Sequence, residues 1–287
     1  MEFVNLNNGI KMPVLGFGVY QIPEAETKQA VLEAITVGYR LIDTAQSYFN
    51  EAAVGEAIAE TAVPRSELFI TTKVWIDNYG YEKTRASVLT SMEKLQVEYI
   101  DLVLLHQALS DYYGAYRALE ELYEEGKIRA IGVSNFNPNR VADLAAFNRV
   151  TPQVNQIEIN PFHQQVAEQE NLVERNIQAE AWAPFGEGKM GIFEDPILTE
   201  IGHKYRKSSA QVILRWLIQR QIVVLAKSVH KTRMAENFDV FDFHLSSADM
   251  ESIKTLDKKE SMFFDFADPK TVDRFVELIE VRKNRRN

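Results

Sequence analysis

Cysteine is absent from the 287 residues of this chain, which excludes disulfides, thiolate metal sites and cysteine nucleophiles. No apolar run is long enough to span a bilayer, and the N-terminus lacks the basic segment and apolar stretch of a signal peptide. Linkers rich in proline, glycine and serine are also missing. We therefore expect a single domain, residues 1–287, in a soluble cytoplasmic monomer that does not bind a membrane.

Positive charge is scarce as well, because the formal net charge is −9. A nucleic-acid groove needs a basic face, so we expect no nucleic-acid partner. The one basic run, Arg282–Arg286, is interpreted as a solvated terminus. Histidine is also rare. The five are scattered, and only His106 and His163 follow predicted strands, so no metal site is predicted.

Apolar residues make up 46% of the chain and gather in short runs that alternate with amphipathic helical stretches. The runs that we expect to form strands are Val14–Tyr20, Tyr39–Asp43, Leu68–Lys73, Tyr99–His106, Arg129–Asn135, Gln153–Asn160, Ala179–Pro184 and Ile222–Ser228. The helical stretches between them include Glu24–Val37, Tyr81–Leu95, Gly114–Glu125 and Ser208–Gln219. Eight such units predict an α/β fold, a (β/α)8 TIM barrel, with an open doubly wound sheet as the alternative.

Both ends of the chain add to this repeat. Asn7-Asn8-Gly9 is a strong turn signal between two short runs and predicts an N-terminal β-hairpin that caps the barrel. A C-terminal extension of helices and loop follows the last unit. We expect helices over Ser247–Leu256 and Pro269–Val281, separated by an aromatic loop that contains Phe263, Phe264 and Phe266.

Four polar residues stand at or just past the ends of predicted strands: Asp43, Tyr48, Lys73 and His106. Each has an ordinary interpretation, as a helix cap, a pocket-edge aromatic, a surface lysine and a core histidine respectively. Polar side chains at the carboxyl ends of buried strands are costly unless they are paired, and active sites of such barrels lie at that end. Because all four fall at the same end, a shared site is the better hypothesis.

Together these four groups can build a general acid. A nearby ammonium favours the phenolate form, so Lys73 is expected to lower the pKa of Tyr48. Asp43 would hold Lys73 charged, and His106 would orient an incoming oxygen. A proton donor aimed at one oxygen suits carbonyl reduction, in which hydride reaches carbon and a proton reaches oxygen. The hydride requires a cofactor, since no side chain supplies one.

The stretch Asp43–Glu51 resembles the signature of the aldo-keto reductases. So do Gly126–Phe136 and the group Lys227, Ser228, Arg233, Glu236 and Asn237. The resemblance covers nearly the whole chain and implies the barrel fold, NADPH as cofactor and Tyr48 as proton donor. It further implies that Ser134, Asn135 and Gln156 bind the nicotinamide carboxamide, that Trp182 stacks on the ring, and that Lys227, Ser228 and Arg233 bind the 2′-phosphate. Further implied contacts are Glu236 and Asn237 on the adenine, with Val19 and Phe185 also at the cofactor.

Two features bear on the pocket. Gly186–Gly191 matches the pattern G-x-G-x-x-G, but it follows the seventh predicted strand and not an opening βαβ unit, so a Rossmann site is not predicted. Gln107 follows His106 where the family often has tryptophan, which implies a more polar pocket. Tyr20, Phe49 and Trp75 are expected to be its other walls. The aromatic C-terminal loop would either close this pocket or be ordinary core.

These observations predict an NADPH-dependent reductase of small aldehydes or ketones. One alternative is an NADPH-binding, redox-sensing accessory subunit with little turnover. The other is a metal-dependent barrel hydrolase or isomerase, which would need converging histidine and carboxylate ligands. Steady NADPH oxidation with a reactive aldehyde, and resistance to EDTA, would separate the three. The natural carbonyl compound is not readable from the sequence.

Overall fold

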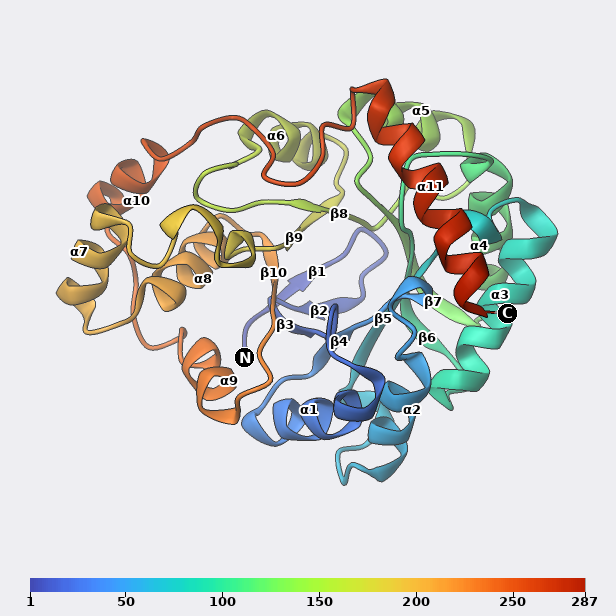
Figure 1. Cartoon of the computed structure of the whole chain (residues 1–287), viewed down its shortest axis with the longest axis horizontal. Helices are drawn as coiled ribbons and strands as arrows, with labels where there is room; N and C mark the ends of the chain where they lie inside the picture. Colours follow the sequence, from blue (N-terminus) through green and yellow to red (C-terminus); the bar gives the residue numbers. More distant parts are fainter. Residues whose placement is uncertain (287) are drawn as a thin grey trace.

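A computed structural model of the chain describes residues 1–286. Its strands are β1 Phe3–Asn5, β2 Lys11–Pro13, β3 Leu15–Gly18, β4 Leu41–Asp43, β5 Phe69–Val74, β6 Ile100–Leu105, β7 Ile128–Ser134, β8 Val154–Glu158, β9 Gln178–Trp182 and β10 Val223–Ala226. Strands β3 to β10 pair in parallel, and β10 closes back onto β3, so that a ring forms (Figure 1). The predicted eight-stranded barrel is confirmed.

Helices surround this ring in the order that the alternating pattern predicts. They are α1 Glu24–Val37, α2 Glu51–Glu60, α3 Tyr81–Leu95, α4 Tyr112–Glu124, α5 Pro138–Phe147, α6 Val166–Glu174, α7 Pro196–Tyr205, α8 Ser209–Gln219, α9 Lys231–Phe238, α10 Ser247–Lys254 and α11 Pro269–Arg286. Short 3-10 turns lie at η1 Gln46–Tyr48, η2 Arg65–Glu67, η3 Ile76–Asn78 and η4 Gly186–Gly191. Among these helices, none within residues 1–286 is long and apolar enough to cross a membrane.

The interior of the barrel is filled by side chains from every strand. Strands β3, β4, β5, β6, β8 and β10 are buried along their whole length, as expected for parallel strands covered on both sides. Gly16 allows close packing, because a Cβ there would lie 2.6 Å from Leu41 and 2.7 Å from Leu225 on the two neighbouring strands. The first strand of the barrel can therefore approach both neighbours tightly.

The N-terminal hairpin covers the end of the barrel at which the strands begin. Strands β1 and β2 pair antiparallel around the Asn7-Asn8-Gly9 turn. The Asn7 amide donates to the backbone carbonyls of Pro152 and Asn176, just before β8 and β9. The hairpin cap is thus confirmed, and it leaves the opposite end, with the carboxyl ends of the strands, available for a site.

The C-terminal extension crosses the carboxyl end of the barrel. Helix α10 ends at Lys254, two residues before the predicted boundary, and α11 runs five residues beyond its predicted end. In Figure 1 α11 passes in front of the barrel on the side of β5 to β7. Phe275 packs against Trp75, with ring centroids 6.1 Å apart. Arg282 was predicted to lie in a solvated tail, but its guanidinium stacks 4.4 Å above the Trp75 ring. The tail side chains beyond Arg282 lie outside the described ones.

Candidate active site

The structure brings Asp43, Tyr48, Lys73 and His106 together at the carboxyl end of the barrel. Asp43 ends β4, Lys73 is the last residue but one of β5, and His106 follows β6. The Lys73 ammonium donates to Asp43 Oδ1 at 2.6 Å and to Tyr48 Oη at 3.3 Å. The rings of Tyr48 and His106 have centroids 5.7 Å apart. One small ligand group can therefore reach the phenol and the imidazole at once.

Tyr48 is held in place by the short turn that carries it. The turn η1 begins one residue after the extended residue Ala45, and the Tyr48 N–H closes it by donating to the Ala45 carbonyl at 3.0 Å. Gln46 anchors it to the neighbouring strand end, since its side-chain oxygen accepts from the Trp75 N–H at 3.0 Å. These contacts hold the Tyr48 phenol beside the Lys73 ammonium.

Asp43 and Lys73 form a buried ion pair. Both side chains are almost completely inaccessible to solvent. Burial raises the pKa of Asp43, and the Lys73 charge opposes that rise. Burial lowers the pKa of Lys73, but the charges of Asp43 and Tyr48 outweigh it and the net pKa is raised. The ammonium donates its third hydrogen bond to the Thr44 carbonyl at 3.0 Å. Lys73 is therefore charged and fixed in direction.

The pKa of Tyr48 corrects an expectation from the sequence. Lys73 does lower it, but desolvation of the phenol is the larger effect, and the Asp43 charge adds to it. The net result raises the pKa of Tyr48 to about 12, above its usual value near 10. The prediction that the net pKa of Tyr48 is lowered is therefore wrong. A phenol that keeps its proton is nevertheless what a proton donor requires.

His106 is held neutral. Burial and the charges of Lys73 and Arg282 lower its pKa well below 6.5. Its Nδ1 lies 3.4 Å from the Ser47 hydroxyl, and Trp75 packs edge-on against the ring at 5.1 Å. The Nε2 atom has no hydrogen-bond partner among the described side chains, which end at Arg282. A neutral imidazole with one nitrogen engaged can present the other to an incoming oxygen.

A second layer of polar groups lies beneath this cluster. Gln156, on β8, donates from its amide nitrogen to Asp43 Oδ2 at 3.0 Å and to Glu180 Oε2 at 2.9 Å. Both N–H groups of the amide are therefore committed, and the carbonyl oxygen is the group left for a ligand. Glu180 was not identified from the sequence. A glutamate within a predicted buried strand, two residues before Trp182, was the signal that could have found it.

The other residues expected at the nicotinamide lie around this layer. Asn135 follows β7 in a left-handed conformation (φ 63°), and its amide donates to the Ser134 hydroxyl at 3.1 Å. The Trp182 indole N–H donates to Asn135 Oδ1 at 2.9 Å, which fixes the ring across the mouth of the barrel. Val19 is fully buried after β3, and its N–H donates to the Asp43 carbonyl, so only its side chain remains for a ligand.

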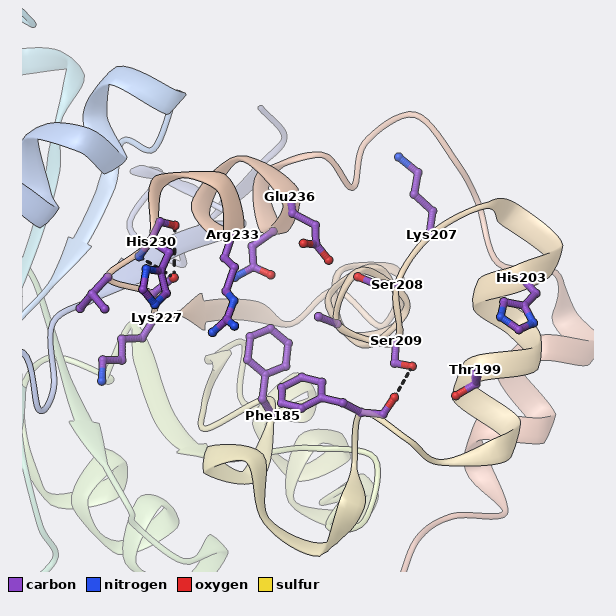
Figure 2. Close-up of a pocket in the computed structure, with 15 residues that line it drawn as sticks. Phe185, Thr199, His203, Lys207, Ser208, Ser209, Lys227, His230, Arg233 and Glu236 are labelled. Carbon is purple, nitrogen blue, oxygen red and sulfur yellow. Dashed lines mark hydrogen bonds between the residues drawn. The ribbon is translucent and has the colours of Figure 1, made fainter.

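A cavity of about 750 Å³ lies beyond the carboxyl end of β10, between α7, α8 and α9. Figure 2 shows Lys227, His230, Arg233 and Glu236 on one side of it and Phe185 on the other. Ser228 and Asn237, also predicted, line the same space. Lys227 and Arg233 are exposed, and neither side chain forms a hydrogen bond or ion pair with the side chains that the structure describes, up to residue 282.

This cavity has the chemistry of a nucleotide-phosphate site. A guanidinium, an ammonium and a hydroxyl are among the groups that line it, and this set binds a phosphate monoester well. Phe185 packs against Phe193 at 5.5 Å and supplies an aromatic wall. The donors present thus fit the phosphorylated adenosine half of NADP. Nine further lining residues were not predicted, because nothing in their local sequence marks a ligand contact: Phe193, Thr199, His203, Lys207, Ser208, Ser209, Ala210, Val229 and His230.

The expected pocket walls differ in exposure. Tyr20 and Phe49 are exposed near Tyr48, and the Tyr20 and Tyr48 ring centroids lie 4.9 Å apart. Trp75 is buried between His106, Phe275 and Arg282. Gln107 is buried directly after His106, and its side-chain oxygen has no hydrogen-bond partner among the described residues. Gln107 thus adds a buried amide to the surroundings of His106.

The glycine-rich segment and the aromatic C-terminal loop meet beside Trp182. Phe263 packs edge-on against Trp182 at 5.1 Å, and the Lys189 ammonium of η4 lies 4.1 Å from the Phe263 ring centroid. Phe264 and Phe266 instead pack with Phe275 of α11. Each of the two interpretations of this loop therefore holds for part of it. Phe263 borders the site, whereas Phe264 and Phe266 are half-buried and pack beneath α11.

These features define a class of protein. A model of the Aldo/keto reductase family matches residues 14–258, and the chain belongs to that family. It is therefore an oxidoreductase that acts on small carbonyl compounds with a nicotinamide cofactor.

Individual relatives agree with this assignment. The chain is 46% identical to the 9,11-endoperoxide prostaglandin H2 reductase of Trypanosoma cruzi, over 89% of this chain and 91% of that protein. It is 45% identical to the glyoxal reductase of Bacillus subtilis, over 90% of this chain and 94% of that protein. The crystal structure of a Bombyx mori aldo-keto reductase in complex with NADP superimposes with a TM-score of 0.88, at 34% identity, over 94% and 96% of the two chains.

Proposed function

We propose that this aldo-keto reductase reduces aldehydes or ketones with NADPH, and that Tyr48 donates the proton. The observation that carries the proposal is the Lys73 ammonium, which contacts both the Tyr48 hydroxyl and the Asp43 carboxylate inside the barrel. When bound, the reduced nicotinamide supplies hydride to the carbonyl carbon. Tyr48 transfers its proton to the carbonyl oxygen, so the products are an alcohol and the oxidised cofactor.

The remaining groups prepare this transfer. The Lys73 charge stabilises the phenolate that forms as the proton leaves, and Asp43 keeps that charge in place. His106, neutral and engaged at Nδ1, offers Nε2 to the carbonyl oxygen. Gln156, Ser134 and Asn135 hold the carboxamide of the cofactor, and Trp182 supports its ring. The barrel wall and Trp75 keep water from the reacting atoms.

The choice of NADPH over NADH rests on the cavity past β10. We propose that Arg233, Lys227 and Ser228 bind the 2′-phosphate, with Glu236 and Asn237 at the adenine and Phe185 beside it. The two cations are exposed and have no partner among the described side chains, so they are available to an anion. The Bombyx mori relative, named as a complex with NADP, supports the same choice.

The substrate is proposed only as a class. Gln107 gives the pocket a polar wall next to His106, and a relative is named glyoxal reductase, so small polar carbonyl compounds are our first choice. A panel of sugars, α-dicarbonyls and aromatic aldehydes, assayed by NADPH absorbance, tests this proposal. We expect steady oxidation that survives EDTA and is fastest with the α-dicarbonyls. Tight NADPH binding without turnover on any of them would favour the accessory-subunit alternative instead.

A further inference from the structure

Glu180 is a carboxyl group that the mechanism above does not use. It lies in the middle of β9, two residues before Trp182, so the two side chains point to the same side of the strand. Its solvent exposure is 0%. One oxygen, Oε2, accepts from Gln156 at 2.9 Å, and Oε1 has no hydrogen-bond partner in the described part of the chain. Glu180 is thus a buried acid one layer below the ring of Trp182.

The charges around Glu180 do not balance if every acid is ionised. Lys73, from β5, is the cation that acts on it, and Lys73 is already in contact with Asp43 of β4 at 2.6 Å. The neighbouring strand β8 presents the neutral Gln156 and, nearer the mouth, Glu158, which is held by Ser261 and Asn160. The other neighbour, β10, is apolar beside it. One ammonium therefore faces two carboxyls that share the Gln156 amide.

Geometry decides which acid keeps its proton. Asp43 contacts an ammonium and Glu180 contacts only an amide, so Glu180 is the acid that stays neutral. Burial, followed by the Asp43 charge, raises the pKa of Glu180 to about 8, against the smaller opposing effects of Gln156 and Lys73. The group is protonated near neutrality and ionises at mildly alkaline pH.

We propose that Glu180 sets the relative affinity of this site for the oxidised and the reduced cofactor. This rests on the proposed function, in which the nicotinamide lies against Trp182. The oxidised ring carries a positive charge that the reduced ring lacks. A carboxylate beneath the ring attracts only the oxidised form, whereas a neutral acid does not discriminate. As pH rises and Glu180 ionises, NADP+ binding strengthens relative to NADPH, and the bound NADP+ in turn favours loss of the Glu180 proton.

The test compares two dissociation constants across pH. The affinities for NADP+ and NADPH are measured by fluorescence quenching from about pH 6 to about pH 9.5, and their ratio is followed. The 2′-phosphate titrates in both cofactors and cancels in the ratio. We expect the ratio to move toward NADP+ by roughly tenfold in the wild type, and to stay flat in Glu180→Gln, which imitates the neutral acid.

Glu51→Gln is the matched control. Glu51 is another buried acid whose pKa is raised by burial, but it bonds to Thr72 behind β5 and not to Gln156. Its variant should keep the wild-type profile. A flat ratio in the wild type, or an undiminished rise in Glu180→Gln, would overturn the inference. Binding of neither cofactor would overturn the proposed function itself.

A calorimetric measurement covers the case in which Glu180→Gln does not fold. Wild-type protein is titrated with each cofactor near pH 7.5 in two buffers of different ionisation enthalpy. We expect NADP+ binding to release a fraction of a proton more than NADPH binding does. Equal proton release for the two cofactors would contradict the role proposed for Glu180 and would leave the proposed reductase function unaffected.

Discussion

The two cationic regions of this site are built in opposite ways. Lys73 is fully buried and uses all three of its donors, on Asp43, Thr44 and Tyr48. Arg233 and Lys227 are exposed and have no hydrogen-bond or ion-pair partner among the side chains described. A buried charge is stable only if the fold supplies its partner, whereas an exposed charge is solvated by water until a ligand binds. The first region is therefore fixed before binding, and the second is completed by it.

This contrast has functional consequences. A preorganised group acts on the transition state without reorganising at the moment of reaction. Exposed cations contribute to binding and are screened by salt. Changes at the buried region should therefore affect turnover and stability, and changes at the exposed region should affect cofactor affinity and selectivity.

Removing the phenol should have the largest effect. Tyr48→Phe keeps the ring and loses the proton donor, so we expect turnover to fall by about 10²–10⁴, the usual contribution of general acid catalysis. NADPH should still quench the protein fluorescence with an affinity near that of the wild type. A variant that keeps more than about a tenth of the rate would exclude Tyr48 as the donor.

Breaking the buried ion pair should cost stability as well as activity. Lys73→Met leaves the Asp43 charge with the Gln156 amide but without its ammonium partner, and we expect the free energy of unfolding in urea to drop by about 3–5 kcal/mol. The double variant Asp43→Asn with Lys73→Met removes both charges and should regain much of that loss. If the single variant is destabilised no more than the double one, the pair is not the stabilising contact that we describe.

Removing the exposed guanidinium should change selectivity and leave the fold intact. We expect Arg233→Ala to bind NADPH roughly 10- to 100-fold more weakly, the range for one charged hydrogen-bonding group, and NADH almost unchanged. Arg175→Ala, an exposed arginine after α6, makes the same change of charge away from the cavity and serves as the control. An equal loss for the two cofactors would refute a 2′-phosphate role.

Ionic strength should have the smallest effect, and it should act differently on the two regions. Raising the ionic strength from about 0.05 M to about 0.5 M shortens the Debye length severalfold and should weaken NADPH binding by a few-fold. Turnover at saturating NADPH should hardly change, because the buried pair is screened little. A fall in saturated turnover as large as the fall in affinity would contradict the division that we draw.

The fold was largely predictable because its signals are local. Most barrel strands are short, largely apolar runs, and Asn7-Asn8-Gly9 marks the hairpin. The boundaries of α1 and α3 match the predicted stretches, because helical periodicity was clear there. The juxtaposition of Asp43, Lys73 and Tyr48 followed from the rule that the strands of such a barrel end on one face.

The remainder depended on contacts between distant parts of the chain. The pKa of Tyr48 was predicted in the wrong direction, because the balance between burial and the Lys73 charge requires coordinates. Glu180 was missed since its partner, Gln156, comes from another strand. Arg282 was taken for a solvated residue, and its position over Trp75 depends on how α11 crosses the barrel.

The most direct test of the account is a crystal structure with NADP+ and a carbonyl-type inhibitor. We predict that one cofactor molecule joins the two regions, with its 2′-phosphate on Arg233 and Lys227 and its nicotinamide against Trp182. The inhibitor oxygen should lie within hydrogen-bond distance of both Tyr48 Oη and His106 Nε2. A nicotinamide bound away from Trp182, or an inhibitor oxygen that contacts neither group, would contradict the account.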